Sequence, residues 1–437
     1  MSGWIISLIV LVVAICAGLA AFGFKGRITT VGVDLGTTFS VVGIYKNGKV
    51  EIVTDKGNHQ IFPSIVSYLD NGEIKVGYDA LPHLSTHPDN TIYNAKRFIG
   101  RSLSEADVQE YAAEHPYHVV ESHTSNYSEV GFVISASGHV NKIVAPEQIG
   151  TQVLKYLMKV TAEYLGHDQV NKAVIAVPAK FSPLQRQATA EAYKKAGLKV
   201  IRLMEEPTAA AVAYQLHKRT DIHHILVYDF GGGTLDVSIL YVAKGSVEVY
   251  ATDGDDTLGG SDIDLCLFKI LKDRILQVSG LDITSQAMTH ETSADCAQDA
   301  SVSASMCTEA AVHTMAEDIK KKLSSQNEVL FSCTLPSESI KKEGVTYTGP
   351  AVSFTVSREQ DLQTGCSALF ERSMLPVQRL LDSLEMSRDN IDEIVLVGGT
   401  TRIPHVKQQL REYFGKELND KIDPDVTVAW GAASVLD

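Results

Sequence analysis

Short apolar runs alternate with longer amphipathic stretches along most of the chain after Lys25. The apolar runs are rich in Val, Ile and Leu and are bounded by Gly, Pro or Asp, which predicts β-strands. The stretches between them place apolar residues at helical spacing, so they predict helices that bury one face. Because the two kinds of element alternate, the pattern as a whole predicts an α/β fold.

Two combinations of elements occur twice. The segments 31–45 and 227–242 each read as an apolar strand, an Asp-x-Gly turn with Thr and a second apolar strand, which predicts a hairpin. The segments 173–198 and 393–415 each run from a buried strand through a tight loop into an amphipathic helix that begins near a proline. A hairpin and a strand–loop–helix unit, repeated in that order, predict duplicated lobes that face each other across a ligand cleft.

The N-terminal segment has a different pattern. Residues 3–24 carry no charge and are long enough to span a bilayer as a helix, so we expect a signal peptide or a membrane anchor over residues 1–24. Lys25 and Arg27 then favour a cytosolic body by the positive-inside rule. The glycosylation triplet that begins at Asn126 favours a lumenal body instead, and these observations leave the topology open.

Composition narrows the functional classes. The chain is 44% hydrophobic and 21% charged, which is ordinary for a globular protein, and its formal net charge of −14 argues against a general nucleic-acid binder. The six cysteines form no CxxC pair and no metal spacing, so we expect mostly buried thiols. Residues 278–315, rich in Ser, Thr and Ala, predict a peripheral subdomain, and residues 333–350 predict a loop between strands.

The two hairpin turns carry residue types that bind a polyphosphate. Glycine backbones leave N–H groups open to phosphate oxygens, and two such loops can hold one phosphate chain. The turn residues are Gly36, Thr37 and Thr38 in the first hairpin and Gly231, Gly232, Gly233 and Thr234 in the second. Asp34, Asp229 and Asp236 would meet across the cleft, where close carboxylates repel unless a cation such as Mg²⁺ lies among them. No Walker A motif occurs, which excludes a P-loop NTPase.

Eight segments carry a more specific signal. They are VGVDLGTTFS (31–40), TIYNAKRFIGR (91–101), AVPAKF (176–181), EPTAAAVAY (206–214), DFGGGTLDVS (229–238), LGGSDID (258–264), VLVGGTTRIP (395–404) and DPDVTVAWGAA (423–433). Together they resemble the nucleotide-binding domain of the Hsp70 chaperone family, from residue 30 to the end. The apolar leader and early stop make the chain most similar to the compact microsomal ATPase cores of that family, which lack a peptide-binding domain.

The resemblance implies an actin-like (ribonuclease H-like) ATPase fold, with two duplicated lobes around a nucleotide cleft. Lobe I would span residues 25–220 and lobe II residues 221–437, with the C-terminal helix packing back on the first lobe. ATP or ADP with Mg²⁺ would be the ligands. Asp34 and Asp229 would hold the ion through its water shell, and Thr37 and Thr234 would contact the phosphates.

The same resemblance implies the remaining site residues. Lys96 would approach the γ-phosphate, Glu206 would place the attacking water, and Asp236 would complete the proton-accepting set. The implied nucleoside contacts are Glu317, Lys320, Lys321, Ser324, Gly398, Gly399, Arg402 and Asp425. Because the family usually has Arg where Lys321 stands, and Lys cannot stack on adenine in that way, we expect weaker nucleotide binding.

These features together predict a slow Mg²⁺-dependent ATPase. The alternatives are a small-molecule kinase of the same fold and a non-catalytic nucleotide-sensing scaffold. The resemblance further implies a monomer in the endoplasmic reticulum lumen, attached to membrane only through its N-terminal segment, with a co-chaperone or nucleotide-exchange factor as partner. No segment after the final helix matches the family's linker and peptide-binding sandwich, so we expect hydrolysis uncoupled from peptide.

Overall fold

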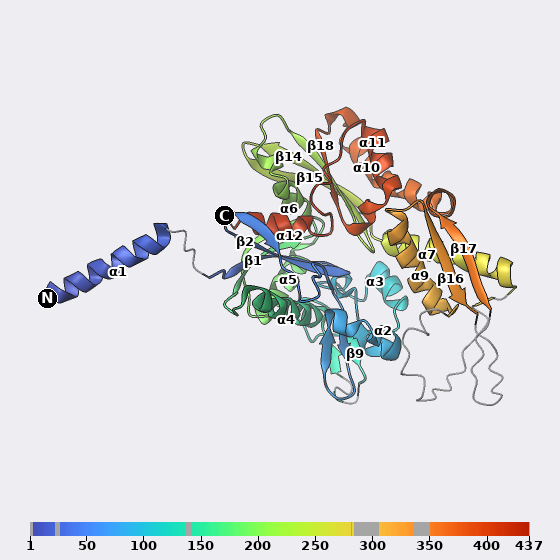
Figure 1. Ribbon diagram of the computed structural model, residues 1–437, viewed down its shortest axis with the longest axis horizontal. Coiled ribbons are helices and arrows are strands. Elements are labelled where there is room, and N and C mark those ends of the chain that lie inside the picture. The colour runs from blue at the N-terminus through green and yellow to red at the C-terminus, as the bar shows by residue number, and fades with distance from the viewer. Residues whose placement is uncertain are drawn as a thin grey trace.

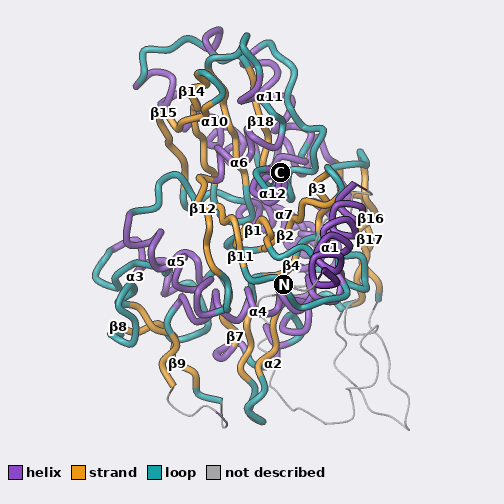
Figure 2. The backbone as a smooth tube through the Cα atoms, turned by 90° about the vertical axis from the view of Figure 1, so that its left-hand side faces the viewer, coloured by secondary structure: helices purple, strands orange, loops and turns teal. Residues whose placement is uncertain are grey.

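The computed structural model describes residues 3–21, 27–136, 138, 142–280, 282–283, 306–335 and 350–436. Two β-sheets form the centres of two lobes, and Figure 1 shows β14, β15 and β18 of lobe II above β1 and β2 of lobe I. The lobe I sheet has the strand order β12-β11-β1-β2-β3 with β4 beside β2, and Figure 2 shows β12, β11, β1 and β2 following one another. The lobe II sheet has the order β15-β14-β13-β18. Their strands are β1 (Thr30–Leu35), β2 (Phe39–Lys46), β3 (Lys49–Ile52), β4 (Phe62–Pro63), β11 (Lys172–Val177), β12 (Lys199–Glu205), β13 (His224–Phe230), β14 (Leu235–Ala243), β15 (Ser246–Asp255) and β18 (Glu393–Val397).

Smaller elements extend each lobe. Two small sheets belong to lobe I, β6-β5-β7 and β10-β9-β8, and the hairpin β16-β17 belongs to lobe II. These strands are β5 (Val66–Tyr68), β6 (Ile74–Val76), β7 (Thr91–Ile92), β8 (Val119–Glu121), β9 (Val130–Ile134), β10 (Lys142–Val144), β16 (Glu328–Thr334) and β17 (Ala351–Ser357).

Helices cover the sheets and connect the lobes. The α-helices are α1 (Gly3–Ala21), α2 (His83–Thr86), α3 (Ala106–Ala113), α4 (Pro146–Leu165), α5 (Pro183–Lys195), α6 (Glu206–Ala213), α7 (Gly260–Ser279), α9 (Glu309–Leu323), α10 (Ser367–Ser383), α11 (Pro404–Phe414) and α12 (Thr427–Ser434). Short helical turns are η1 (Gly77–Ala80), η2 (Pro88–Asn90), η3 (Ala95–Arg97), η5 (Leu216–Lys218), η6 (Arg358–Thr364), η7 (Arg388–Asn390) and η8 (Gly399–Arg402).

Each central sheet contains the same unit. Strand β1 pairs antiparallel with β2 and parallel with β11, and β13 pairs antiparallel with β14 and parallel with β18. Strands β11 and β18 each lead into a helix whose first residue is proline, Pro183 in α5 and Pro404 in α11. Proline suits this position because its missing N–H would have no partner inside the helix. The structure thus confirms both repeated units predicted from the sequence.

Helix α12 packs closely on β1 and on α6. A Cβ atom at Gly431 would lie 1.8 Å from the carbonyl oxygen of Ala209, and one at Gly32 would lie 2.3 Å from the backbone nitrogen of Ala433. Glycine is therefore required at both positions for these backbones to approach. The contact fixes α6, whose first residue is Glu206, against the edge of the cleft.

The cysteine prediction is wrong for four of the six residues. Cys266 of α7 is bonded to Cys366, and Cys307 is bonded to Cys333 of β16. The bonded residues are 100 and 26 positions apart, so no short spacing motif marked them. Both bonds lie in lobe II, and Cys296 lies outside the described residues.

Three other expectations concern segments that the structure describes in part. The described helices include none that is long and apolar enough to cross a membrane, so the predicted span over residues 3–24 is not confirmed. Residues 278–315 contain the end of α7 and the start of α9, while residues 281 and 284–305 lie outside the described part of the chain. The predicted loop covers residues 333–350: residues 333 and 334 belong instead to β16, and residues 336–349 also lie outside the described part.

Candidate active site

Four carboxylates gather where the lobes meet. Asp34 lies near the end of β1, and Asp229 lies at the matching place in β13. Asp236 of β14 is directly opposite Asp229 in the hairpin ladder, so both side chains are on one face of the sheet. Glu206 begins α6 and interacts electrostatically with all three aspartates. The structure therefore brings together the aspartates of two hairpins about 200 residues apart.

Burial makes the three aspartates of this group hard to ionise. Burial, with repulsion from Glu206, raises the pKa of Asp34 to about 7, and Lys96 opposes the shift. Burial also raises the pKa of Asp229 well above its ordinary value, and repulsion from the neighbouring carboxylates adds to it. Raised pKa values of this kind indicate negative charge that the protein's own cations do not balance.

Lys96 is the cation at the centre of this group. Its Nζ lies 2.7 Å from Oε1 of Glu206, and the two side chains are only 11% and 14% exposed. Burial lowers the pKa of Lys96, but attraction from Glu206 and Asp34 outweighs burial and raises the pKa. Lys96 therefore carries its charge at neutral pH, in a position set by η3 on one side and α6 on the other.

Lys180 is a second cation that our reading of the sequence missed. It follows β11, and its Nζ lies 3.1 Å from Oδ1 of Asp236 in lobe II. Burial raises the pKa of Asp236, while the charge of Lys180 and its hydrogen bond oppose the shift. A Cβ atom at Gly254 would lie 2.5 Å from this Nζ, so glycine there leaves room for the pair. Its only sequence signal is its position in AVPAKF (176–181), one of the segments that carry the resemblance.

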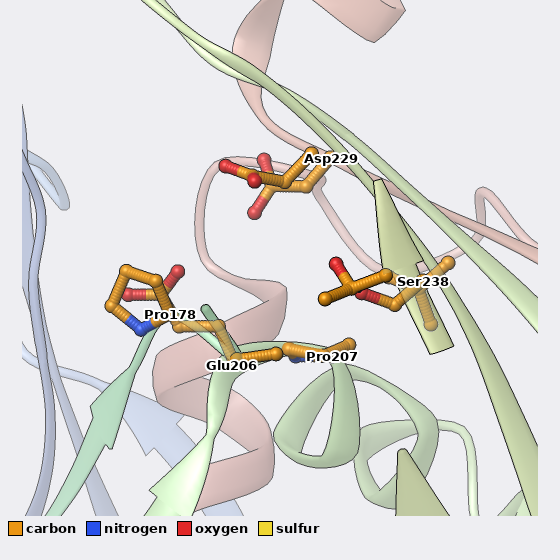
Figure 3. Close-up of a pocket in the computed structure, with 9 residues that line it drawn as sticks. Pro178, Glu206, Pro207, Asp229 and Ser238 are labelled. Carbon is orange, nitrogen blue, oxygen red and sulfur yellow. The ribbon is translucent and has the colours of Figure 1, made fainter. Parts of the chain in front are cut away.

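A small pocket opens beside these groups. Figure 3 shows Glu206 and Pro207 on one side of it and Asp229 on the other. Its full lining is Pro178, Ala179, Glu206, Pro207, Val227, Asp229, Asp236, Ser238 and Thr252. Two carboxylates at opposite walls and a third beside them make the pocket suitable for water and cations rather than for an apolar ligand.

The two Gly-rich turns lie against each other. A Cβ atom at Gly232 would be 3.1 Å from Oγ1 of Thr38, which brings the lobe II turn into contact with the lobe I turn. Glycine is required at position 36, where a Cβ atom would lie 2.0 Å from the carbonyl oxygen of Phe39. Gly36, Thr37 and Lys96 also line a second small pocket. The two Gly-rich turns are thus in contact across the lobes, and the second pocket is lined by lobe I alone.

The residues implied as nucleoside contacts come from three segments of lobe II. In α9, Nζ of Lys321 lies 2.6 Å from Oε1 of Glu317, and Ser324 donates to the backbone carbonyl of Lys320. Nζ of Lys320 lies 2.8 Å from Asp264 and donates to the carbonyl of Gly260 at 2.9 Å. Lys320 is therefore held by lobe II itself, in a pair that is nearly buried.

The loop after β18 supplies three of the other contacts, and the segment before α12 supplies the fourth, Asp425. The backbone of Gly398 has a φ of +81°, and a Cβ atom there would lie 2.9 Å from Oδ1 of Asp229. Arg402 donates to Oδ2 of Asp425 at 2.9 Å, and a Cβ atom at Gly399 would lie 2.7 Å from Oδ1 of Asp425. Burial raises the pKa of Asp425, and Arg402 and Lys321 oppose the shift. Attraction between Asp425 and Lys321 shows that α9 lies close to this loop.

A family model described as Hsp70 protein matches residues 30–436. The chain belongs to the Hsp70 family. The predicted actin-like ATPase fold, with its mixed helices and sheets, is thereby confirmed. Hsp70 proteins are ATPases whose nucleotide-binding domains take ATP or ADP, generally with Mg²⁺, and which work with co-chaperones. The repeated hairpins of this chain accordingly belong to an Hsp70 nucleotide-binding domain.

The residues of this Hsp70 chain fit Mg²⁺. Asp34 and Asp229 are buried carboxylates with unbalanced negative charge, and Mg²⁺ prefers oxygen ligands while keeping several waters. In the described part of the chain, no three or more His, Cys, Asp or Glu residues are placed to bind a metal ion together. Two carboxylates that bind Mg²⁺ through its water shell would not form such a group.

Proposed function

We propose that this chain binds Mg²⁺-ATP between its lobes and slowly hydrolyses it to ADP and phosphate. The ion pair of Lys96 and Glu206 supports this most directly, because it is nearly buried among the cleft aspartates and lies beside the first Gly-rich turn. Phosphoryl transfer depends mainly on positioning and charge stabilisation, and a fixed cation beside a carboxylate supplies both. Asp34 and Asp229 would hold Mg²⁺ through its waters, and the ion would offset the charge of the phosphates.

Each side chain then has a separate task. Lys96 places its charge where negative charge develops on the transferred phosphoryl group, and Glu206 orients the attacking water through a hydrogen bond. As the water oxygen bonds to phosphorus and the bond to the bridging oxygen of ADP breaks, Asp236 receives the water's proton. The pair with Lys180 keeps the carboxylate of Asp236 in one orientation.

Single-turnover hydrolysis of γ-labelled ATP tests this proposal. The chain is mixed in excess over ATP, with and without a panel of sugars and small organic acids. We expect labelled inorganic phosphate at the same rate in both conditions. Labelled acceptor would identify a small-molecule kinase instead, and tight ATP binding without any product would identify a nucleotide-sensing scaffold.

We further propose that the body of the protein lies in the endoplasmic reticulum lumen, as a monomer similar to the microsomal stress-70 ATPase core. The two disulfides support this location, because such bonds persist in oxidising compartments. Asn126 is exposed, so a glycan there would meet no packed side chain. Its partner would be a co-chaperone or an exchange factor that binds the lobe surface, with membrane contact limited to the N-terminal segment.

Glycosidase treatment of the full chain from intact cells tests this location. We expect a mobility shift that is lost in Asn126→Gln. Digestion of an unglycosylated chain by protease added outside sealed microsomes would place the body in the cytosol. The triplet's third residue, Ser128, is unsuitable for mutation, because its hydroxyl donates to the buried carboxylate of Glu147 at 2.5 Å.

A further inference from the structure

The backbone of the second Gly-rich turn is held by hydrogen bonds on its carbonyl side. Within lobe II, the carbonyl of Gly231 accepts from the N–H of Gly260 at 3.0 Å and from the hydroxyl of Thr400 at 2.8 Å. The carbonyl of Gly232 accepts from the N–H of Ser261 at 2.8 Å. Because a peptide unit is planar, fixing its carbonyl also fixes the direction of the N–H that follows. Lobe II therefore sets two peptide units of the turn by itself.

The third carbonyl is held by the other lobe. Nη2 of Arg97 donates to the carbonyl of Gly233 at 2.6 Å, and Nη1 donates to the carbonyl of Asp256 at 2.7 Å. Arg97 ends η3 in lobe I, and its two acceptors lie 136 and 159 residues later, in lobe II. Among the described residues, the carbonyl of the last peptide unit of the turn is thus held from lobe I, by Arg97.

Both sides of this contact are preorganised. The guanidinium of Arg97 lies over the ring of Tyr111, 4.3 Å from its centroid, which limits the directions in which it can point. On the lobe II side, Arg372 of α10 makes two hydrogen bonds of 2.6 Å to the carboxylate of Asp255, next to the acceptor Asp256. A bidentate pair of this kind fixes the turn that carries the acceptor carbonyl. Neither partner must reorganise for the lobes to join.

The hydrogen bonds of Arg97 orient the backbone of lobe II rather than attract an opposite charge. Both acceptors are backbone carbonyls, so Arg97 does not neutralise a carboxylate when it crosses the cleft. Its Nε is buried with no hydrogen-bond partner among the described residues. A planar guanidinium that uses two of its donors on two backbone carbonyls fixes their separation and plane, which a point charge cannot do.

We propose that Arg97 is an interlobe clasp, a positioning residue that completes the second phosphate-binding turn only when the lobes are closed and so sets the rate of nucleotide release. The inference rests on the proposed function, because it assigns regulation to the same cleft. Arg97 directly follows Lys96, and both residues lie on the short helical turn η3. Opening of the clasp and movement of the catalytic cation are therefore changes of the same turn.

Release of a fluorescent ADP analogue from the full chain, measured by stopped flow, tests the clasp. Arg97→Gln should accelerate release of the analogue by about tenfold or more, since it removes two hydrogen bonds that a charged group donates to backbone carbonyls. Arg97→Lys should give a smaller increase, because an ammonium cannot reach both carbonyls in one plane. Arg372→Gln should also accelerate release without altering Arg97, which provides an independent variant if the first folds poorly.

Arg101→Gln is the matched control. Arg101 lies four residues after Arg97 and pairs with Glu105 and Asp107, all within lobe I, so the variant loses a similar arginine without an interlobe contact. It should release the analogue at the parent rate. Parent-like release in Arg97→Gln, at an unchanged melting temperature, would overturn the clasp but leave the ATPase proposal standing. A parent chain that binds no nucleotide would overturn both.

Discussion

Removing the disulfide between Cys307 and Cys333 should loosen helix α9 and, with it, the nucleoside side of the cleft. Cys307 lies two residues before α9, and Cys333 lies in β16, so the bond ties the start of the helix to the hairpin beneath it. Both cysteines are buried, at 1% and 2% exposure. Helix α9 carries the residue pair Glu317 and Lys321, whose position depends on where the helix starts.

The expected magnitude follows from the size of the closed loop. The bond joins residues 26 positions apart, and cross-linking a loop of that length removes unfolded-chain entropy worth about 3.5 kcal/mol at 25 °C. The second bond, Cys266 to Cys366, closes a loop of 100 positions and corresponds to about 4.7 kcal/mol by the same relation. The second bond remains in the variant, so it limits the opening to the region around α9.

Hydrogen exchange followed by mass spectrometry measures this locally. In the double variant Cys307→Ala/Cys333→Ala, the opening free energy of residues 309–323 should fall by up to about 3.5 kcal/mol. Residues 146–165 of lobe I, in α4, serve as the control within the same molecule and should not change. ADP affinity should fall together with protection of α9. Equal protection of α9 in the parent and the variant would refute the entropic argument. An equal loss of protection in α9 and in α4 would refute it as well.

Three further substitutions test the catalytic and nucleoside residues. Lys96→Ala should lower single-turnover hydrolysis by about 10² to 10³ while Mg²⁺-ATP binding, measured by calorimetry, largely remains, because a fixed charge matters most in the transition state; hydrolysis at the parent rate would remove Lys96 from the mechanism. Lys180→Met should lower hydrolysis about fivefold, as expected for a partly exposed ion pair worth about 1 kcal/mol, and Lys180→Arg should restore it. Its control, Lys407→Met, removes an ion pair within lobe II whose side chains are similarly exposed, and it should hydrolyse ATP at the parent rate; equal effects of the two Met variants on hydrolysis would make the Lys180 pair merely structural. Lys321→Arg should tighten ADP binding about two- to fivefold in calorimetry, because a guanidinium can stack on adenine, and unchanged affinity would show that no stacking occurs there.

The sequence by itself determined the features that depend on local pattern. The hairpins that carry Asp34 and Asp229 were predictable because an apolar run, a Gly-containing turn and a second apolar run specify a hairpin through neighbouring residues. The helices that begin at Pro183 and Pro404 were predictable because proline is favoured at the first helical position. The repetition of these units, with the motifs between them, was enough to predict the lobes and the cleft.

The tertiary structure alone decided how distant side chains pair. The bond between Cys266 and Cys366 joins residues 100 positions apart, and the sequence predicted thiols because no spacing rule relates such residues. The sequence assigned no role to Lys180 or Arg97, and only the closed arrangement of the lobes brings one to Asp236 and the other to the backbone of Gly233. Side-chain pairs of this kind depend on the relative position of two sheets. That position is set by packing summed over many buried residues, including the close contact of α12 with α6, and no short segment of the sequence encodes it.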